Sequence, residues 1–328
     1  MALGRRAMLI TLKVAFSVAL IAFLLWRIPL ARVAEALASA DPRWLAAAAG
    51  VMLLSNLLGS YQWWRLLRVA DIRIPLWKAC TYYHIGLFFN NFLPANIGGD
   101  IARVADSSRH GGTTGAAVSA VVMDRLIGTV ALASLALVTT LPAVDHFHLA
   151  LAYLCLVAFF VISVGLLWGL FHPRLLPAIE RALARVGLGR LSPHLDELAL
   201  RLEAYRGARA LLARMLVVAT VTQLMRIGVH FLVSRALGLH ISLQYFLLFV
   251  PLLAVIVSLP ISLNGLGLRE GAGVLLFGLI GVDRPRAFSL QFLTYLVAVA
   301  VSLLGGFAYL IRIPQRRAAA RSLERNAG

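Results

Sequence analysis

Two stretches of an otherwise apolar chain combine asparagines, glycines and charges in a pattern that suits the binding of a phosphate. The first is NNFLPANIGGDIAR, residues 90–103. Gly98 and Gly99 permit a tight turn with bare amides, and a helix that restarts near Asp100 points the positive end of its dipole into that turn. Bare amides, with Arg103 one turn later, are groups that hold a phosphate. The candidate binding residues of this stretch are Asn90, Asn91, Asn96, Gly98, Gly99, Asp100 and Arg103.

The same residues also fit a structural break that binds no ligand. Asparagine side chains cap helix ends, and Asp100 pairs readily with Arg103 at i,i+3. The stretch holds more polar groups than a cap requires, so we favour a binding role.

The second stretch, LPISLNGLGLREG at residues 259–271, repeats this composition. Counted from the proline of each stretch, leucine, glycine and arginine recur at the same offsets, which aligns Arg103 with Arg269. Arg269 and Glu270 are adjacent, so on a helix they point in different directions and do not simply neutralise each other. An ion pair with another segment is the structural alternative. The candidate binding residues here are Asn264, Gly265, Gly267, Arg269 and Glu270.

Residues 113–141 carry Asp124 and Arg125 about a third of the way along an apolar segment. Charges at such a depth are rare in membrane helices and usually face a cavity. Arg125 can extend its long side chain toward the membrane surface, whereas Asp124 cannot. We therefore expect Asp124 to pair inside the bundle, and both residues join the candidate site.

Residues 209–237 carry Gln223, Arg226 and His230 on one helical face. An arginine near mid-membrane needs an anion, either a carboxylate of the broken segments or the phosphate of a lipid. Histidine titrates near neutral pH, so His230 is a candidate for proton coupling, with a hydrogen-bonded packing role as the alternative. Arg226 and His230 complete the set of candidate substrate-binding residues.

An all-helical membrane protein is required to position these residues. The 328 residues are 61% hydrophobic and 14% charged, with a mean hydropathy of +0.86, as is typical of a polytopic membrane protein. The net charge of +17 comes almost wholly from arginines between the apolar runs, which fits anionic lipid head groups and argues against nucleic acid as a partner. Apolar runs long enough to cross ~30 Å of hydrocarbon lie at residues 8–27, 44–62, 113–141, 148–171, 209–237 and 284–311.

The orientation follows from the loop charges, because arginine-rich short loops face the cytoplasm. The basic segments are the N-terminus, residues 65–78, residues 172–208 and the C-terminal tail. Placing all of them inside requires residues 79–92 to enter the membrane, turn at Pro94 and return, and residues 243–259 to do the same at Pro260. We predict six full transmembrane helices plus two re-entrant helical hairpins arranged as an inverted repeat, with both termini cytoplasmic in the cell inner membrane.

A single transmembrane domain is therefore expected over residues 1–328. Its first repeat unit, a hairpin followed by a span, is residues 79–141, and its second is residues 243–311. Residues 172–208 are predicted to form a cytoplasmic connection of one or two amphipathic surface helices.

The sequence shows no catalytic or metal-binding constellation. HExxH, P-loop and GxGxxG patterns are missing, as is a triad spacing of serine, histidine and aspartate. Cys80 and Cys155 are too isolated for a disulfide framework or a zinc site. Asp145, His146 and His148 share a loop but lack a fourth ligand. We expect no enzyme activity, no metal and no cofactor.

Three motifs in order, NNFLPANIGGDIAR, MDRLIG and PISLNGLGLREG, resemble the transmembrane region of lysylphosphatidylglycerol synthases. That flippase-like family includes stand-alone membrane proteins associated with polyprenyl-linked sugars, hopanoids and other lipids. Aminoacyl transfer in the two-part synthases belongs to a separate soluble domain, which we do not expect in this chain ending at Gly328. The resemblance therefore implies lipid translocation. Carried over residue by residue, it gives weight to Asn91, Pro94, Gly98, Gly99, Asp100, Arg103, Asp124, Arg125, Asn264, Gly265, Gly267, Arg269 and Glu270.

The expected function is that of a flippase-like transporter that moves an anionic lipid, a phospholipid or a polyprenyl-phosphate-linked lipid, between leaflets. Three arginines would hold the phosphate in a polar cavity, and three carboxylates would balance them when it is empty. These are Arg103, Arg226 and Arg269, and Asp100, Asp124 and Glu270. The expected partners are this lipid and anionic phospholipids at the cytoplasmic face. Two alternatives stay open: a membrane enzyme acting on lipid phosphates, and a scaffold for a lipid-modifying glycosyltransferase or synthase.

Overall fold

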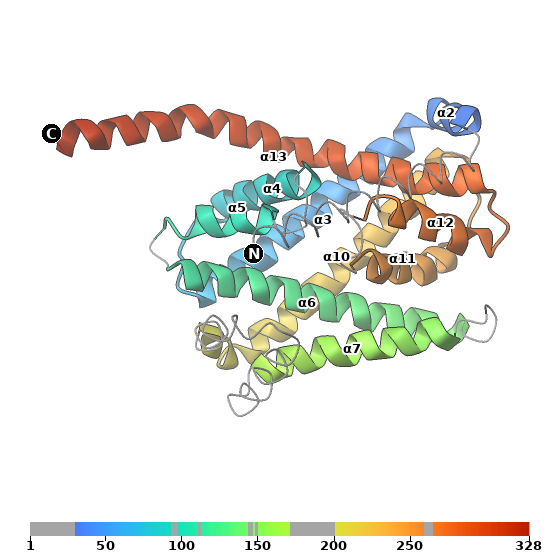
Figure 1. Cartoon of the computed structure of the whole chain (residues 1–328), viewed down its shortest axis with the longest axis horizontal. Helices are drawn as coiled ribbons and strands as arrows, with labels where there is room; N and C mark the ends of the chain where they lie inside the picture. Colours follow the sequence, from blue (N-terminus) through green and yellow to red (C-terminus); the bar gives the residue numbers. More distant parts are fainter. Residues whose placement is uncertain are drawn as a thin grey trace, which may run out of the picture.

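Long apolar helices dominate the computed structural model of the chain (Figure 1). The structure describes residues 30–92, 98–110, 113–143, 147, 150–170, 201–258 and 265–327, and every regular element in these ranges is helical. Five helices are long and apolar enough to cross a membrane. They are α3 (Pro42–Val69), α6 (Thr114–Thr140), α7 (Ala150–Leu170), α10 (Arg209–Ala236) and the first part of α13 (Arg284–Ala327). Five of the six predicted spans are thus present, while residues 8–27 lie outside the described ranges.

Local sequence explains where the long helices begin. Asp41 precedes α3 and accepts a hydrogen bond from the N–H of Arg43 at 2.8 Å, with Pro42 at the first helical position. Thr113 precedes α6 and accepts one from the N–H of Ala116 at 3.2 Å. At the other end of the chain, α13 continues as a helix to Ala327, beyond the predicted span at 284–311.

Two pairs of short helices lie where the breaks are predicted. The first pair is α4 (Leu76–Phe92) with α5 (Gly98–Ser107), and the second is α11 (Leu243–Ser258) with α12 (Leu268–Gly278). The partners of each pair pack on each other. α4 has 17 residues, so it reaches only about 26 Å at ~1.5 Å per residue. No helix of either pair therefore reaches the length of a full span.

The helices α3 to α6 and the helices α10 to α13 make the same set of contacts. Within each group the first helix packs on the second, the second on the third, the third on the fourth, and the first on the fourth. Between the groups, α3 packs on α10, α4 on α13 and α11 on α6. The starts differ by 167 residues for α3 and α10 (42 and 209) and by 170 for α6 and α13 (114 and 284). In each group the first long helix precedes the residues that are predicted as a repeat unit.

The two groups run in opposite directions through the molecule. The N–H of Asp41, at the start of α3, donates to the carbonyl of Ala236, at the end of α10, over 2.9 Å. The hydroxyl of Tyr205, just before α10, donates to the carbonyl of Leu66 near the end of α3 over 3.0 Å. Because these bonds join opposite ends, α3 and α10 are antiparallel. α6 and α13 also run in opposite directions (Figure 1).

α4 is held by unusually close backbone contacts on two sides. A Cβ on Gly99 of α5 would overlap the carbonyl of Gly86 in α4, and a Cβ on Gly305 of α13 would overlap the carbonyl of His84. Only glycine permits approaches this short. α4 is therefore fixed against both α5 and α13.

Candidate functional site

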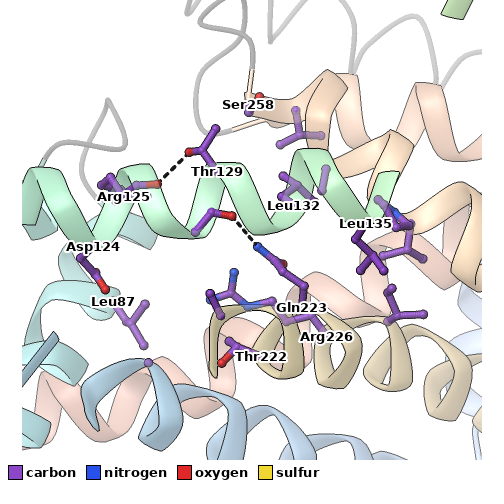
Figure 2. Close-up of a pocket in the computed structure, with 18 of the residues that line it drawn as sticks. Leu87, Asp124, Arg125, Thr129, Leu132, Leu135, Thr222, Gln223, Arg226 and Ser258 are labelled. Carbon is purple, nitrogen blue, oxygen red and sulfur yellow. Dashed lines mark hydrogen bonds between the residues drawn. The ribbon is translucent and has the colours of Figure 1, made fainter. Parts of the chain in front are cut away.

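A cavity of about 470 Å³ lies where the two helix groups meet (Figure 2). Its lining comes from helices of both groups, α3 to α6 and α10 to α12. Polar lining residues outside the predicted set include Gln62, Tyr83, Thr129 and Thr222. The predicted site residues that line it are Asn90, Arg103, Asp124, Arg125, Arg226, His230 and Arg269.

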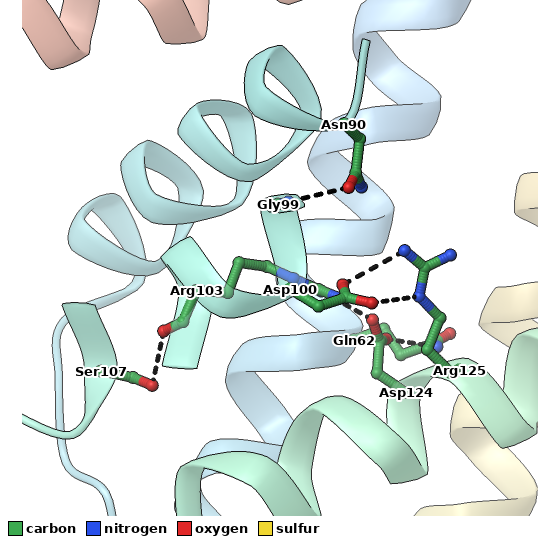
Figure 3. Close-up of polar contacts among 8 residues, drawn as sticks. All are labelled: Gln62, Asn90, Gly99, Asp100, Arg103, Ser107, Asp124 and Arg125. Carbon is green, nitrogen blue, oxygen red and sulfur yellow. Dashed lines mark hydrogen bonds and ion pairs between the residues drawn. The ribbon is translucent and has the colours of Figure 1, made fainter. Parts of the chain in front are cut away.

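Arg103 of α5 is buried and fully engaged by the protein. Its side chain is 6% exposed, and its two terminal nitrogens lie 2.8 Å from Asp124 and 2.6 Å from Asp100 (Figure 3). The rings of Trp63 and Tyr83 lie 5.3 and 5.0 Å from its guanidinium carbon. Two of the three carboxylates predicted to balance the arginines, Asp100 and Asp124, thus both pair with Arg103. These contacts leave Arg103 little capacity to bind a ligand.

Asp100 also binds Arg125 of α6, through Nε at 3.0 Å and a terminal nitrogen at 3.1 Å. Gln62 of α3 donates from Nε2 to Asp124 over 2.8 Å. Asp124 is thus paired inside the bundle, as its short side chain predicts. Asp100, Arg103, Asp124 and Arg125, here called the neutral cluster, tie α5 to α6 (Figure 3). The i,i+3 pair of Asp100 with Arg103 that the structural alternative predicts is part of this cluster.

One amide after each break is hydrogen-bonded to a side chain of the protein. The N–H of Gly99 donates to Oδ1 of Asn90 over 2.8 Å. At the second break, the N–H of Gly267 donates to Oε2 of Glu270 over 2.7 Å. The prediction of a bare amide at Gly99 is therefore wrong, because Asn90, nine residues earlier on α4, caps α5. Gly98 and Gly99 belong to the first turn of α5 and not to the preceding turn.

Arg226 presents a different case from Arg103. It lies near the middle of α10 and lines the cavity. Among the residues that the structure describes, its guanidinium forms no ion pair with a carboxylate. One turn later, Nδ1 of His230 is 3.0 Å from the carbonyl oxygen of Arg226. Gln223, one turn earlier, donates to the carbonyl of Gly128 over 3.4 Å. The predicted common face of these α10 residues is therefore turned toward the cavity.

At the second break, Arg269 and Glu270 point to different surroundings. Arg269 lines the cavity and lies over the ring of Tyr295, at 4.5 Å from its centroid. Glu270 is buried, caps α12 through Gly267 and does not line the cavity. Asp100 and Glu270 are each the third residue of their helix. The helix starts thus align Asp100 with Glu270, and the proline-based alignment of Arg103 with Arg269 is wrong.

The remaining predicted residues lie elsewhere. Asn96 and Asn264, like the loop residues Asp145, His146 and His148, fall outside the described residues. Those that the structure describes away from the cavity lining are Asn91, Gly98, Gly99, Asp100, Gly265, Gly267 and Glu270. Within the described ranges, no three potential metal ligands come together. Sequence reasoning missed Gln62, although a glutamine inside an apolar span is a usable signal.

Long apolar helices, two broken helix pairs and a polar cavity between them define a multi-pass membrane protein. The chain matches the family described as the lysylphosphatidylglycerol synthase TM region over residues 10–324, and it belongs to that family. Membership places it among membrane proteins connected with lipids and confirms the resemblance of its three motifs. Neither a search of curated proteins nor a search of solved structures returned a match.

Proposed function

We propose that the protein moves an anionic lipid between the two leaflets and holds its phosphate in the central cavity. The observation that carries this proposal is Arg226, a cation on a membrane-length helix that faces the cavity without a carboxylate among the described residues. An arginine at mid-membrane costs about 2.5–3.5 kcal/mol on insertion scales. A bound phosphate would offset that cost through charge-assisted hydrogen bonds.

The proposed architecture has six full spans and two re-entrant hairpins in the inner membrane, with both termini cytoplasmic. The hairpins would be α4–α5 and α11–α12, entering from opposite faces. Repeated helix contacts in two oppositely directed groups support this inverted repeat. Basic loops on one side support the orientation.

In the proposed mechanism the residues of the cavity have separate tasks. Arg226 and Arg269 attract the phosphate, while Asn90 and Gln223 offer neutral donors at the cavity wall. The neutral cluster holds α5 in place beside them and contributes little net charge. A change in the packing of one helix group against the other would then expose the cavity to each leaflet in turn.

We further propose that the site catalyses no reaction on the lipid. The carboxylates that would serve as acid, base or metal ligands are engaged: Asp100 and Asp124 by arginines, Glu270 by the amide of Gly267. Incubation of the purified protein with labelled phosphatidylglycerol and with a labelled polyprenyl phosphate tests this. A new labelled product on thin-layer chromatography would favour the membrane-enzyme alternative.

Lipid translocation tests the proposed function directly. The protein is reconstituted into phosphatidylcholine vesicles that contain fluorescent phosphatidylglycerol, and external dithionite measures how fast the inner fluorophore becomes accessible. We expect Arg226→Ala to slow this rate about tenfold or more, since a charged hydrogen bond contributes about 1.5–3 kcal/mol.

The matched control is Arg235→Ala. Arg235 lies on the same helix, with its guanidinium 4.9 Å from the ring centroid of Phe231, and it does not line the cavity. Its loss should leave the rate unchanged. If Arg226→Ala folds normally and translocates at the wild-type rate, the proposed function is wrong in its central residue.

A further inference from the structure

The cavity has a polar wall and an apolar wall. Its polar wall includes Thr222, Gln223, Arg226 and His230 of α10. Across the cavity, α11 contributes only apolar groups apart from Ser258 near its end, and beyond Thr129 the lining residues of α6 are two leucines. The apolar wall is defined by Leu132, Leu135, Val250, Pro251, Leu253, Ala254 and Val257. Such a division suits an amphiphile better than a soluble anion, which would leave the apolar wall without a contact.

The volume of the cavity limits how much of a lipid it can enclose. At about 30 Å³ for each water-sized group, its volume of about 470 Å³ holds about 16 such groups. A diacyl or polyprenyl lipid is several times larger. The cavity therefore accommodates a head group and the first segment of one chain, and the remainder has to leave between two helices.

The two candidate seams occupy equivalent places in the repeated packing. They are the seam between α4 and α13 and the seam between α6 and α11. The first is closed, since a Cβ on Gly305 would overlap the carbonyl of His84. By the offset of 170 residues between α6 and α13, the position of Gly305 corresponds to Leu135 in the second seam. Leu135 lines the cavity, as do residues on the facing side of α11.

We propose that a hydrocarbon chain of the substrate leaves the cavity between α6 and α11, in contact with Leu132, Leu135, Ala254 and Val257. This inference rests on the proposed function for the place of the phosphate, beside Arg226. The chain itself needs no strong attraction, because lipid tails and an apolar wall are equivalent surroundings. This path admits only a substrate that carries a hydrocarbon chain next to its phosphate and whose chain fits between α6 and α11.

Photochemical labelling locates the chain. The protein is reconstituted in phosphatidylcholine vesicles with a small fraction of phosphatidylglycerol whose acyl chain carries a diazirine. After irradiation, mass spectrometry maps the labelled peptides with and without excess unlabelled phosphatidylglycerol. Label in the site is competed, whereas label from surrounding lipid is not. We expect competed label on α11 and on the second half of α6. Leu154 and Ile162 of α7, which are 65% and 61% exposed, should carry label that is not competed.

A steric variant makes the test specific. Ala254→Phe places a ring in the apolar wall and should abolish the competed label on α6. Gly128→Leu serves if that variant does not fold, because Gly128 lines the cavity and a Cβ there meets nothing within 4 Å. Gly165→Leu on α7 is the matched control, with equally open space and no place in the lining.

The outcomes distinguish the proposed chain path from the proposed function on which it rests. Competed label on α4 or α13, or label on α11 that excess lipid does not reduce, would overturn the proposed path. Translocation at the wild-type rate together with such a result would leave the flippase function standing. Competed label on α11 without any translocation would support the chain path and remove the flippase function.

Discussion

The two short helix pairs place their arginines in opposite situations. In the first pair, Arg103 is enclosed by two aspartates and two aromatic rings. In the second pair, Arg269 lines the cavity over Tyr295, and the buried carboxylate beside it, Glu270, is occupied with a backbone amide. The two arginines therefore have different surroundings, and because the helix starts align Asp100 with Glu270, they do not occupy equivalent positions in their helices.

The seam between α4 and α13 also differs from the seam between α6 and α11. α13 lies against α4 with glycine at the contact, whereas α6 presents leucines to the cavity in front of α11. If the two helix groups were packed symmetrically, the seam between α4 and α13 and the seam between α6 and α11 would be either both closed or both open. The two seams are therefore packed differently, although both groups make the same set of helix contacts.

The largest effect on stability is expected at Arg103. Arg103→Ala leaves Asp124 buried without its cation, a change that costs about 3–5 kcal/mol when one partner of a buried pair is removed. The free energy of unfolding in a mild-detergent denaturant titration measures this. Arg226→Ala should not lower it, because among the described residues no ion pair with a carboxylate is lost.

A double variant checks that the cost at Arg103 comes from the pair. In Arg103→Ala with Asp124→Ala, no unpaired charge is left between α5 and α6, so part of the lost stability should return. Equal losses for Arg103→Ala and Arg226→Ala would mean that the ion pairs of Arg103 do not stabilise the fold.

Five spans and the short helices on either side of the two prolines could be predicted from the sequence, because apolar length and proline position are local properties. Seven of the candidate residues line the cavity for a similar reason: a charge within an apolar span has few places to go. The capping of Gly99 by Asn90 could not be predicted, since it depends on how α4 packs beside α5. The alignment of Arg103 with Arg269 failed because the chain resumes its helix sooner after Pro94 than after Pro260.

The close packing of α13 on α4 could not be predicted from the sequence. Gly305 and Gly306 stand together in an apolar run, which indicates close packing in a membrane but not the partner. The partner, His84 of α4, lies more than two hundred residues earlier in the chain. Similarly, the aromatic contacts of Trp63 and Tyr83 with Arg103 exist only after three helices meet.

A smaller effect on stability is expected from adding a methyl group at a glycine contact between α4 and α13. Gly305→Ala adds one methyl group against the backbone of α4 and should cost about 1–3 kcal/mol, as overpacking does in a well-packed interior. Gly228→Ala on α10 is the matched control, because a Cβ there meets nothing within 4 Å. It should not lower the free energy of unfolding. If Gly305→Ala and Gly228→Ala changed the free energy of unfolding equally, α13 would not be packed tightly against α4 at Gly305. The seam between α4 and α13 would then not differ from the seam between α6 and α11.

The smallest effect is expected at Asn90, which both caps α5 and lines the cavity. Asn90→Ala removes the cap on Gly99 and should cost about 1 kcal/mol. Asn90→Asp keeps an acceptor for that amide, and a carboxylate near a helix start is favourable, so stability should be retained. The same carboxylate lies at the cavity wall, where it opposes an anionic lipid. Translocation of phosphatidylglycerol should therefore slow in Asn90→Asp more than in Asn90→Ala, although the alanine variant is the less stable protein. If the translocation rates of the two variants instead rank in the same order as their stabilities, Asn90 affects transport only by stabilising the fold.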